Sequence, residues 1–163
     1  MSILEICQWL EKTPLGVEIQ QSVWWFPLLN VAHVLGMAVA AGTIAFVDLR
    51  LLGLGIQKAP ISHITRNLLP WVWGGFVVMF ISGSLLIASE AVMLYGNIAF
   101  RLKLCLLVLT GINVLVFHRT VYRNVSAWEM APVAPFRARL AGGISLTCWL
   151  VLIALGRVVP YLE

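Results

Sequence analysis

The stretch VWWFPLLNVAHVLGMAVAAGTIAFVD, residues 23–48, decides the fold class of this 163-residue chain. No Asp, Glu, Lys or Arg lies between Glu18 and Asp48. This run is longer than the roughly 20 apolar residues that a membrane-spanning helix needs. Trp24 and Trp25 mark one boundary of the span, because tryptophan is enriched where a bilayer meets water. The stretch therefore predicts a first transmembrane helix.

The rest of the chain has the same character. It is 61% hydrophobic and 11% charged, whereas about 25% of the residues of a soluble domain are charged. Only a bilayer covers so apolar a surface, which excludes a soluble enzyme. The Lys and Arg residues lie in short clusters between apolar runs, so we do not expect nucleic acid as a partner. The three cysteines are too widely spaced for a disulfide framework or a metal motif.

Three further apolar runs predict spans at roughly 67–90, 101–122 and 138–158. The last two are full-length if their flanking Lys and Arg side chains reach back to the interfaces. We expect Pro70 in the first turn of its span, where the missing N–H costs little. The sequence therefore predicts an all-α integral membrane protein, a single domain over 1–163 with four helices in an up-down bundle.

The segment 1–22 has apolar residues on one helical face, opposite Glu5 and Lys12. It predicts a short amphipathic helix at the membrane interface. Four spans place the loops 49–67 and 119–139 on one side of the membrane, and together these loops carry seven Lys and Arg residues against four on the other side. Because positive charge favours the cytoplasmic side, both termini are expected outside.

His33 lies inside the first span, roughly 13 Å from the Trp24 boundary at helical rise. Polar side chains near the middle of a bilayer persist only with a partner or a function. A neutral imidazole binds a metal through one nitrogen while its other N–H donates to an acceptor, and Asn30, one turn away, is a candidate acceptor. A histidine bound to a neighbouring helix without any metal is the alternative. Gly36 lies on the same face and would let a flat ring approach.

His118 ends the apolar part of the third span, with Gly111 on its face and Arg119 and Arg123 just beyond. This set suits a haem, which needs an axial imidazole, a small residue against the ring, and cations near the propionates. Close helix packing is the alternative role of the glycine.

One haem shared by His33 and His118 needs a tilted ring or tilted helices. His118 lies roughly 22 Å from the outer boundary, several ångström deeper than His33. His63, in a basic loop, is the third candidate ligand, and an exposed loop histidine is its alternative role. Copper competes with haem iron because Met37 lies one turn from His33, although the chain shows no Met-x-x-Met cluster.

Asp48 and Glu90 are charged residues at the edges of apolar runs. Such residues either mark the membrane boundary or line an ion or proton path. Apolar residues continue on both sides of Asp48, so we expect its side chain to turn into the bundle and pair with an arginine of the third or fourth helix. No hydrolytic or nucleotide-binding motif occurs.

Five segments carry a family resemblance: TPLGVE at 13–18, NVAHVLG at 30–36, VDLRLLG at 47–53, LLPW at 68–71, and Asn113 to His118. The chain resembles a family of small four-helix proteins of the bacterial inner membrane that is known only as a domain of unknown function. The resemblance implies the four-helix topology and the inner membrane, where the charge distribution places the termini in the periplasm, but it assigns no catalytic residue. A looser similarity links the chain to b-type membrane cytochromes and to the copper-resistance membrane domain.

The leading hypothesis is a b-type haem protein in which His33 and His118 are axial ligands and Arg119 or Arg123 neutralises a propionate. It implies electron transfer or redox sensing with a redox partner. A transporter or channel subunit for ions, protons or copper, with Asp48, Glu90 and His33 along a polar path, is the second hypothesis. A structural subunit of a membrane complex is the third. A homo-oligomer in the lipid bilayer is compatible with all three.

Overall fold

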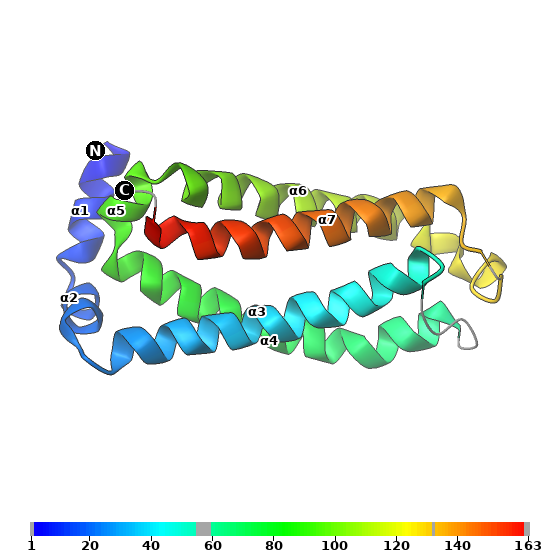
Figure 1. Ribbon diagram of the computed structural model, residues 1–163, viewed down its shortest axis with the longest axis horizontal. Helices are drawn as coiled ribbons and strands as arrows, with labels where there is room; N and C mark the ends of the chain where they lie inside the picture. Colours follow the sequence, from blue (N-terminus) through cyan, green and yellow to red (C-terminus); the bar gives the residue numbers. More distant parts are fainter. Residues whose placement is uncertain (1, 55–59, 132, 162–163) are drawn as a thin grey trace.

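The computed structural model describes residues 2–54, 60–131 and 133–161, and these residues form helices and turns without a strand. Lys58, one of the seven bases counted above, lies outside them. The long helices are α3 (Trp25–Leu51), α4 (Ile61–Ser89), α6 (Ile98–Thr120) and α7 (Phe136–Val158). Each is long and apolar enough to cross a membrane, and they run along the long axis of the molecule in Figure 1. The predicted all-α four-helix membrane bundle is confirmed.

The two ends of the bundle differ. One end, the terminal end, holds both termini and three short helices, α1 (Ile3–Glu11), α2 (Pro14–Gln21) and α5 (Ala91–Gly96) (Figure 1). The opposite loop end holds the C-terminal end of α3, the first turn of α4 and the 3-10 segment Tyr122–Ala127. A second short 3-10 turn, Val159–Tyr161, follows α7.

The short N-terminal helix expected from the sequence forms as α1, and the rest of the segment 1–22 forms a second helix, α2. The Thr13 hydroxyl accepts from the Gly16 N–H at 3.2 Å and donates to the Leu10 carbonyl at 2.6 Å. Thr13 therefore caps α2 while Pro14 takes the first helical position, where its missing N–H costs nothing. Gly16 packs so closely that an added Cβ would lie 2.9 Å from the Ala88 carbonyl oxygen at the end of α4.

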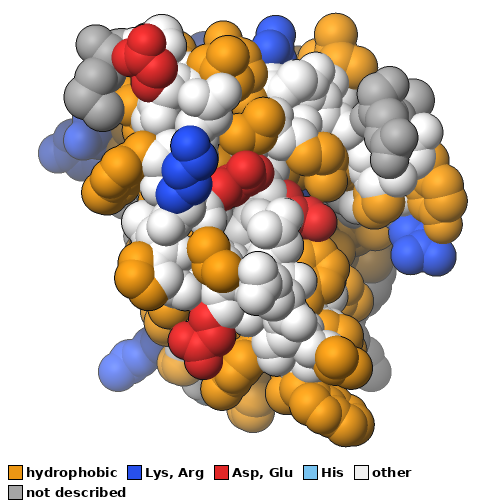
Figure 2. All heavy atoms as spheres, turned by 90° about the vertical axis from the view of Figure 1, so that its left-hand side faces the viewer, with side chains coloured by type: hydrophobic (Ala, Val, Ile, Leu, Met, Phe, Trp, Pro, Cys, Tyr) orange, Lys and Arg blue, Asp and Glu red, His pale blue; other side chains and the backbone are white. Residues whose placement is uncertain are grey.

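The terminal end carries the acidic side chains of the short helices. Glu11 at the end of α1 accepts a hydrogen bond from the Val92 N–H of α5 at 2.8 Å. Figure 2 shows this end, with acidic side chains lying among hydrophobic ones. The N-terminal helices thus pack across the end of the bundle.

The second span begins earlier than predicted, at Ile61 instead of residue 67. Ile61 is only 1% exposed and packs with Leu51, Ala134 and Ala138 in a hydrophobic cluster at the loop end, which holds the first turns of α4 in place. Pro70 consequently lies in the interior of α4 and not in its first turn. There its ring removes the hydrogen bond that the Arg66 carbonyl would otherwise accept.

Two contacts hold the middle of the bundle together. Gly36 of α3 meets Gly75 of α4 so closely that a Cβ on Gly75 would lie 2.7 Å from the Gly36 carbonyl oxygen. Trp149 and Leu152 of α7 pack on Ala41 of α3 in a cluster that we call the middle layer. The outer faces are apolar, as a lipid-facing surface requires; Phe80 of α4, for example, is 75% exposed.

Candidate polar sites inside the bundle

His33 is bound by α4. Its Nδ1 lies 3.0 Å from the Met79 carbonyl oxygen and 3.2 Å from the Ser82 hydroxyl. Because a carbonyl only accepts, Nδ1 carries the proton, and the lone pair of the neutral ring is on Nε2. The expected acceptor was Asn30, but the Asn30 amide donates to the Phe26 carbonyl of its own helix at 3.2 Å and is exposed.

The ring of His33 fits against a glycine. A Cβ added to Gly83 would lie 2.8 Å from His33 Cε1, so only glycine leaves room for the imidazole at this point of α4. The Lys103 ammonium of α6 lies within electrostatic range of His33, and its Nζ would be 3.5 Å from a Cβ on Gly156 of α7. We call His33, Met79, Ser82 and Gly83 the His33 site.

His118 lies elsewhere, on an exposed face near the loop end of α6. Its Nδ1 bonds to the Val114 carbonyl of the same helix at 3.0 Å. Its ring contacts Tyr122 with 5.0 Å between centroids, and Phe117 edge-on at 5.5 Å. No part of this contact set belongs to α3 or α4.

The structure therefore does not bring His33 and His118 together. His33 is eight residues into α3, about 12 Å, and His118 is twenty residues into α6, about 30 Å. Both helices begin at the terminal end (Figure 1), so the histidines differ in depth by about 18 Å. The difference exceeds the sequence estimate because α6 begins at Ile98, ahead of Lys103. Two ligands of one iron must lie within a few ångström of each other, so one haem does not fit between these two side chains.

The other residues expected around a haem are dispersed. Gly36 faces the backbone of α4, where an added Cβ would lie 2.9 Å from the Gly75 carbonyl oxygen, and this leaves no room for a ring. Gly111 faces open space on α6. Arg119 and Arg123 are exposed.

His63, the third candidate ligand, is also exposed, and its Nδ1 lies 3.3 Å from the side-chain nitrogen of Asn67. Among the described residues, no three His, Cys, Asp or Glu side chains form a group that could hold a metal ion.

Asp48 lies in the loop-end half of the bundle and is only 5% exposed. The expectation that it turns into the bundle is therefore confirmed. Its predicted partner is wrong, since the side chain that faces it is Ser145 of α7 and not an arginine of α6 or α7. Gly142 permits this approach of the helices, because an added Cβ would lie 3.2 Å from the Asp48 carbonyl oxygen.

The polar atoms around Asp48 are not satisfied. Asp48 Oδ2 and Ser145 Oγ are buried without a formed hydrogen bond in the described part of the chain. The same is true of Trp149 Nε1, one turn further along the same face of α7. Ser145 is 4% and Trp149 3% exposed. Asp48, Ser145 and Trp149 form what we call the Asp48 site.

Glu90 does not line the interior. It lies between α4 and α5 at the terminal end, half-buried and close to Glu11. Burial raises the pKa of Glu90 above its usual value, and the negative charge of Glu11 raises it further.

Sequence reasoning missed Ser82, Ser145 and Trp149. The two serines were detectable as polar residues inside apolar runs, but their helical partners were not. The two sites meet in the middle layer, because Met79 of the His33 site and Trp149 of the Asp48 site belong to the same hydrophobic cluster.

The bundle and its buried polar groups define a multi-pass membrane protein of the all-α class. The chain belongs to the family described as a family of unknown function, DUF6644, whose model matches residues 9–162. The expected membership of a family of unknown function is thereby confirmed, whereas the bacterial inner membrane and the looser similarities to cytochromes and copper-resistance proteins stay predictions. No curated protein and no solved structure matches the chain.

Proposed function

We propose that the chain is a subunit of a membrane transporter or channel that moves protons through its helix bundle. The observation that carries the proposal is Asp48, a carboxylate-bearing residue 5% exposed within α3 whose Oδ2 has no hydrogen-bond partner in the described residues. A buried carboxylate oxygen without a hydrogen bond costs free energy, and an ionisable residue inside a membrane helix is a candidate for an ion or proton pathway.

The Asp48 site has the chemistry of a proton acceptor. The carboxylate accepts a proton to become a neutral acid, which its surroundings favour, and releases it when the site is hydrated. The Ser145 hydroxyl both donates and accepts, whereas the Trp149 indole only donates. A hydrogen-bonded water bridging these groups would satisfy all three, as buried waters commonly do.

The His33 site is the second proton-binding group on this route. Nδ1 is bound by α4, so the free Nε2 is the nitrogen that takes up a proton. Apart from the Trp149 N–H, the middle layer in which the two sites meet is apolar, as in pores that close by excluding water. The structure is thus a closed conformation in this proposal, and passage requires the middle layer to move.

Purified protein in liposomes loaded with a pH-sensitive dye tests the proposal. A potassium gradient with valinomycin drives protons inward, and wild type should acidify the lumen. Asp48→Asn should slow this flux at least tenfold, because an amide does not carry a proton at this pH. Glu18→Gln is the matched control: it removes an exposed carboxylate on α2 and should leave the flux unchanged. A wild-type flux no greater than that of empty liposomes, or an undiminished flux in Asp48→Asn, contradicts the proposal.

The second candidate function is binding of haem b, with copper as an alternative metal. The observation in its favour is the His33 ring, whose Nδ1–H is held by a backbone carbonyl as in many metal-bound histidines. Since His118 lies about 18 Å away in depth, the second ligand would come from another copy of the chain, which makes a homo-oligomer part of this candidate. Electron transfer to a redox partner would then be its role. Purified protein without a Soret band and without stoichiometric iron or copper rules it out.

The proposed location is the bacterial inner membrane with both termini in the periplasm, on the basis of the seven bases against four. Cys7 on α1 tests the orientation in a variant that lacks Cys105 and Cys148. A membrane-impermeant maleimide should label it in intact spheroplasts. If Cys7 were labelled only after lysis, the termini would lie on the cytoplasmic side, opposite to the proposed orientation.

A further inference from the structure

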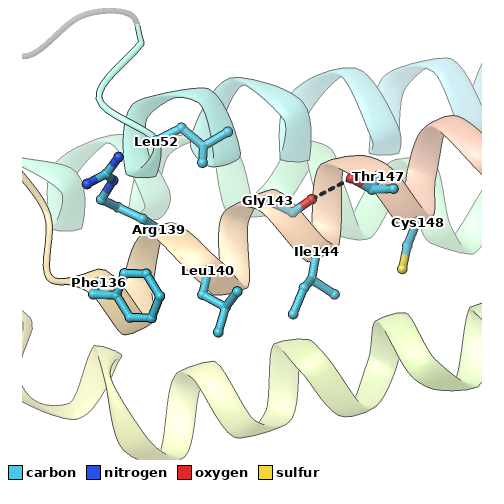
Figure 3. A pocket seen from close by; sticks show the side chains of 8 residues that line it. All are labelled: Leu52, Phe136, Arg139, Leu140, Gly143, Ile144, Thr147 and Cys148. Atoms are coloured by element: carbon cyan, nitrogen blue, oxygen red, sulfur yellow. Dashed lines mark hydrogen bonds between the residues drawn. The ribbon is translucent and has the colours of Figure 1, made fainter.

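A groove runs along the outside of α7 in the loop-end half of the bundle, with a volume of about 560 Å³. Figure 3 shows its wall, one face of α7 from Phe136 to Cys148 with Leu52 from the end of α3 beside it. The volume lies within the range of roughly 300–1,000 Å³ that is usual for ligand sites. Its lining is apolar except for Arg139, Thr147 and the thiol of Cys148.

The length of the groove matches one leaflet of a bilayer. Phe136 and Cys148 are twelve residues apart, about 18 Å along a helix, and half of the hydrocarbon core is about 15 Å. Arg139 lies in the first turn of α7, where the helix meets the headgroups, and Cys148 lies toward the middle of the bundle. The groove is therefore one leaflet deep, with a cation at its headgroup end.

The side chains leave this groove open and its cation available. The Thr147 hydroxyl donates to the Gly143 carbonyl at 2.9 Å, the dashed line in Figure 3, so it needs no partner from a ligand. A Cβ on Gly143 would meet only Leu52 Cδ2, at 3.8 Å, so the glycine gives the groove its depth. The guanidinium of Arg139 is exposed and bonds to none of the described residues.

We propose that this groove binds one anionic phospholipid, with the phosphate on Arg139 and an acyl chain lying along Gly143 toward Cys148. A negatively charged headgroup is favoured over a zwitterionic one because its net charge is attracted to the Arg139 guanidinium that lines the groove, whereas Arg137, Arg119 and Arg123 do not line it. Each basic residue near a membrane surface adds about 1 kcal/mol to the attraction for anionic lipid. This site is independent of the proton pathway.

Native mass spectrometry of the full chain, released from micelles with equal amounts of phosphatidylglycerol and phosphatidylcholine of the same acyl chains, tests the proposal. Wild type should retain the anionic lipid with a preference of about fivefold. Arg139→Gln should abolish this preference. Arg137→Gln is the matched control, an exposed arginine two residues away that does not line the groove, and it should keep most of the preference.

A second variant tests the acyl chain. Gly143→Leu fills the groove and leaves Arg139 in place, so it should reduce the bound fraction of both lipids. Equal losses in Arg137→Gln and Arg139→Gln would show a diffuse charge effect and overturn the proposal. Undiminished lipid binding in Gly143→Leu would show headgroup attraction alone and overturn it as well.

Discussion

The same helix, α3, carries two ionisable side chains into the bundle, and their surroundings differ. His33 in the terminal-end half is held by α4 through the Met79 carbonyl and Ser82. Asp48 in the loop-end half faces α7, where Oδ2 and the Ser145 hydroxyl have no formed hydrogen bond. A satisfied polar group stabilises a fold, whereas an unsatisfied one destabilises it. The comparison predicts that the hydrogen bonds of His33 stabilise the fold, whereas the burial of Asp48 costs stability.

The largest effect is expected at the α3–α4 contact beside His33. Gly75→Ala places a Cβ 2.7 Å from the backbone nitrogen of Ala40, and the helices have to separate, which should cost about 3 kcal/mol of unfolding free energy. Gly111→Ala on α6 is the control, since nothing lies within 4 Å of its added Cβ. It should raise stability by up to about 1 kcal/mol. Denaturation in mixed micelles, followed by circular dichroism, measures both, and equal effects would refute the close packing.

The next prediction compares the two ionisable residues directly. His33→Ala should lower the free energy of unfolding by about 2 kcal/mol, because the hydrogen bond that Nδ1–H donates to Met79 and Ser82 and the packing against Gly83 are lost. Asp48→Asn should leave it equal to or above the wild-type value, because a neutral amide costs less to bury than a carboxylate. The same denaturation assay serves. A loss above about 1 kcal/mol in Asp48→Asn would show a structural role and remove the distinction.

The serines repeat the comparison on a smaller scale. Ser82 donates to the Val78 carbonyl at 2.6 Å and lies beside His33, so Ser82→Ala should cost about 1 kcal/mol. Ser145→Ala removes a hydroxyl without a formed hydrogen bond, and stability should change by less than about 0.5 kcal/mol. Thermal unfolding of both variants under the same conditions measures the two stability losses. A larger loss in Ser145→Ala than in Ser82→Ala would contradict the assignment.

The smallest effect is expected outside the spans, at Glu90. Burial and the charge of Glu11 raise its pKa above 4.5, so the folded terminal end binds this proton more tightly than the unfolded chain does. This stabilisation is complete below pH 4.5 and is lost as the pH rises through the raised pKa. Glu90→Gln should therefore slow amide exchange in α1 at pH 7 relative to wild type and have little effect at pH 4. Faster amide exchange in Glu90→Gln than in wild type at pH 7 would show that the charged Glu90 stabilises the terminal end, which contradicts the prediction.

The spans were predictable because every helix that crosses a bilayer needs about 20 predominantly apolar residues. The ends of the spans were not, since they depend on contacts made after folding. Ile61 extends α4 through its packing against Leu51, and this contact moves Pro70 from a first turn into a helix interior. The short helix α1 was predictable from its amphipathic pattern, whereas the second helix, α2, which Thr13 caps and Pro14 begins, was not predicted.

The candidate site was partly predictable. His33 and Asp48 were singled out because ionisable residues are rare in so apolar a chain. Their partners came from other helices, and no spacing in the sequence states which faces of two helices meet. Gly36 illustrates this limit: the same small residue suits a flat cofactor or a neighbouring glycine, and Gly75 takes that place.

The bond between Glu11 and Val92 also constrains the order of events during synthesis. It joins residues 81 positions apart, which a ribosome adding about 5 to 20 residues per second makes in roughly 4 to 16 seconds. For that interval α1 exists before α5. Helix α1 therefore forms this contact only after α3 and α4, which lie between it and α5 in the chain, have been synthesised.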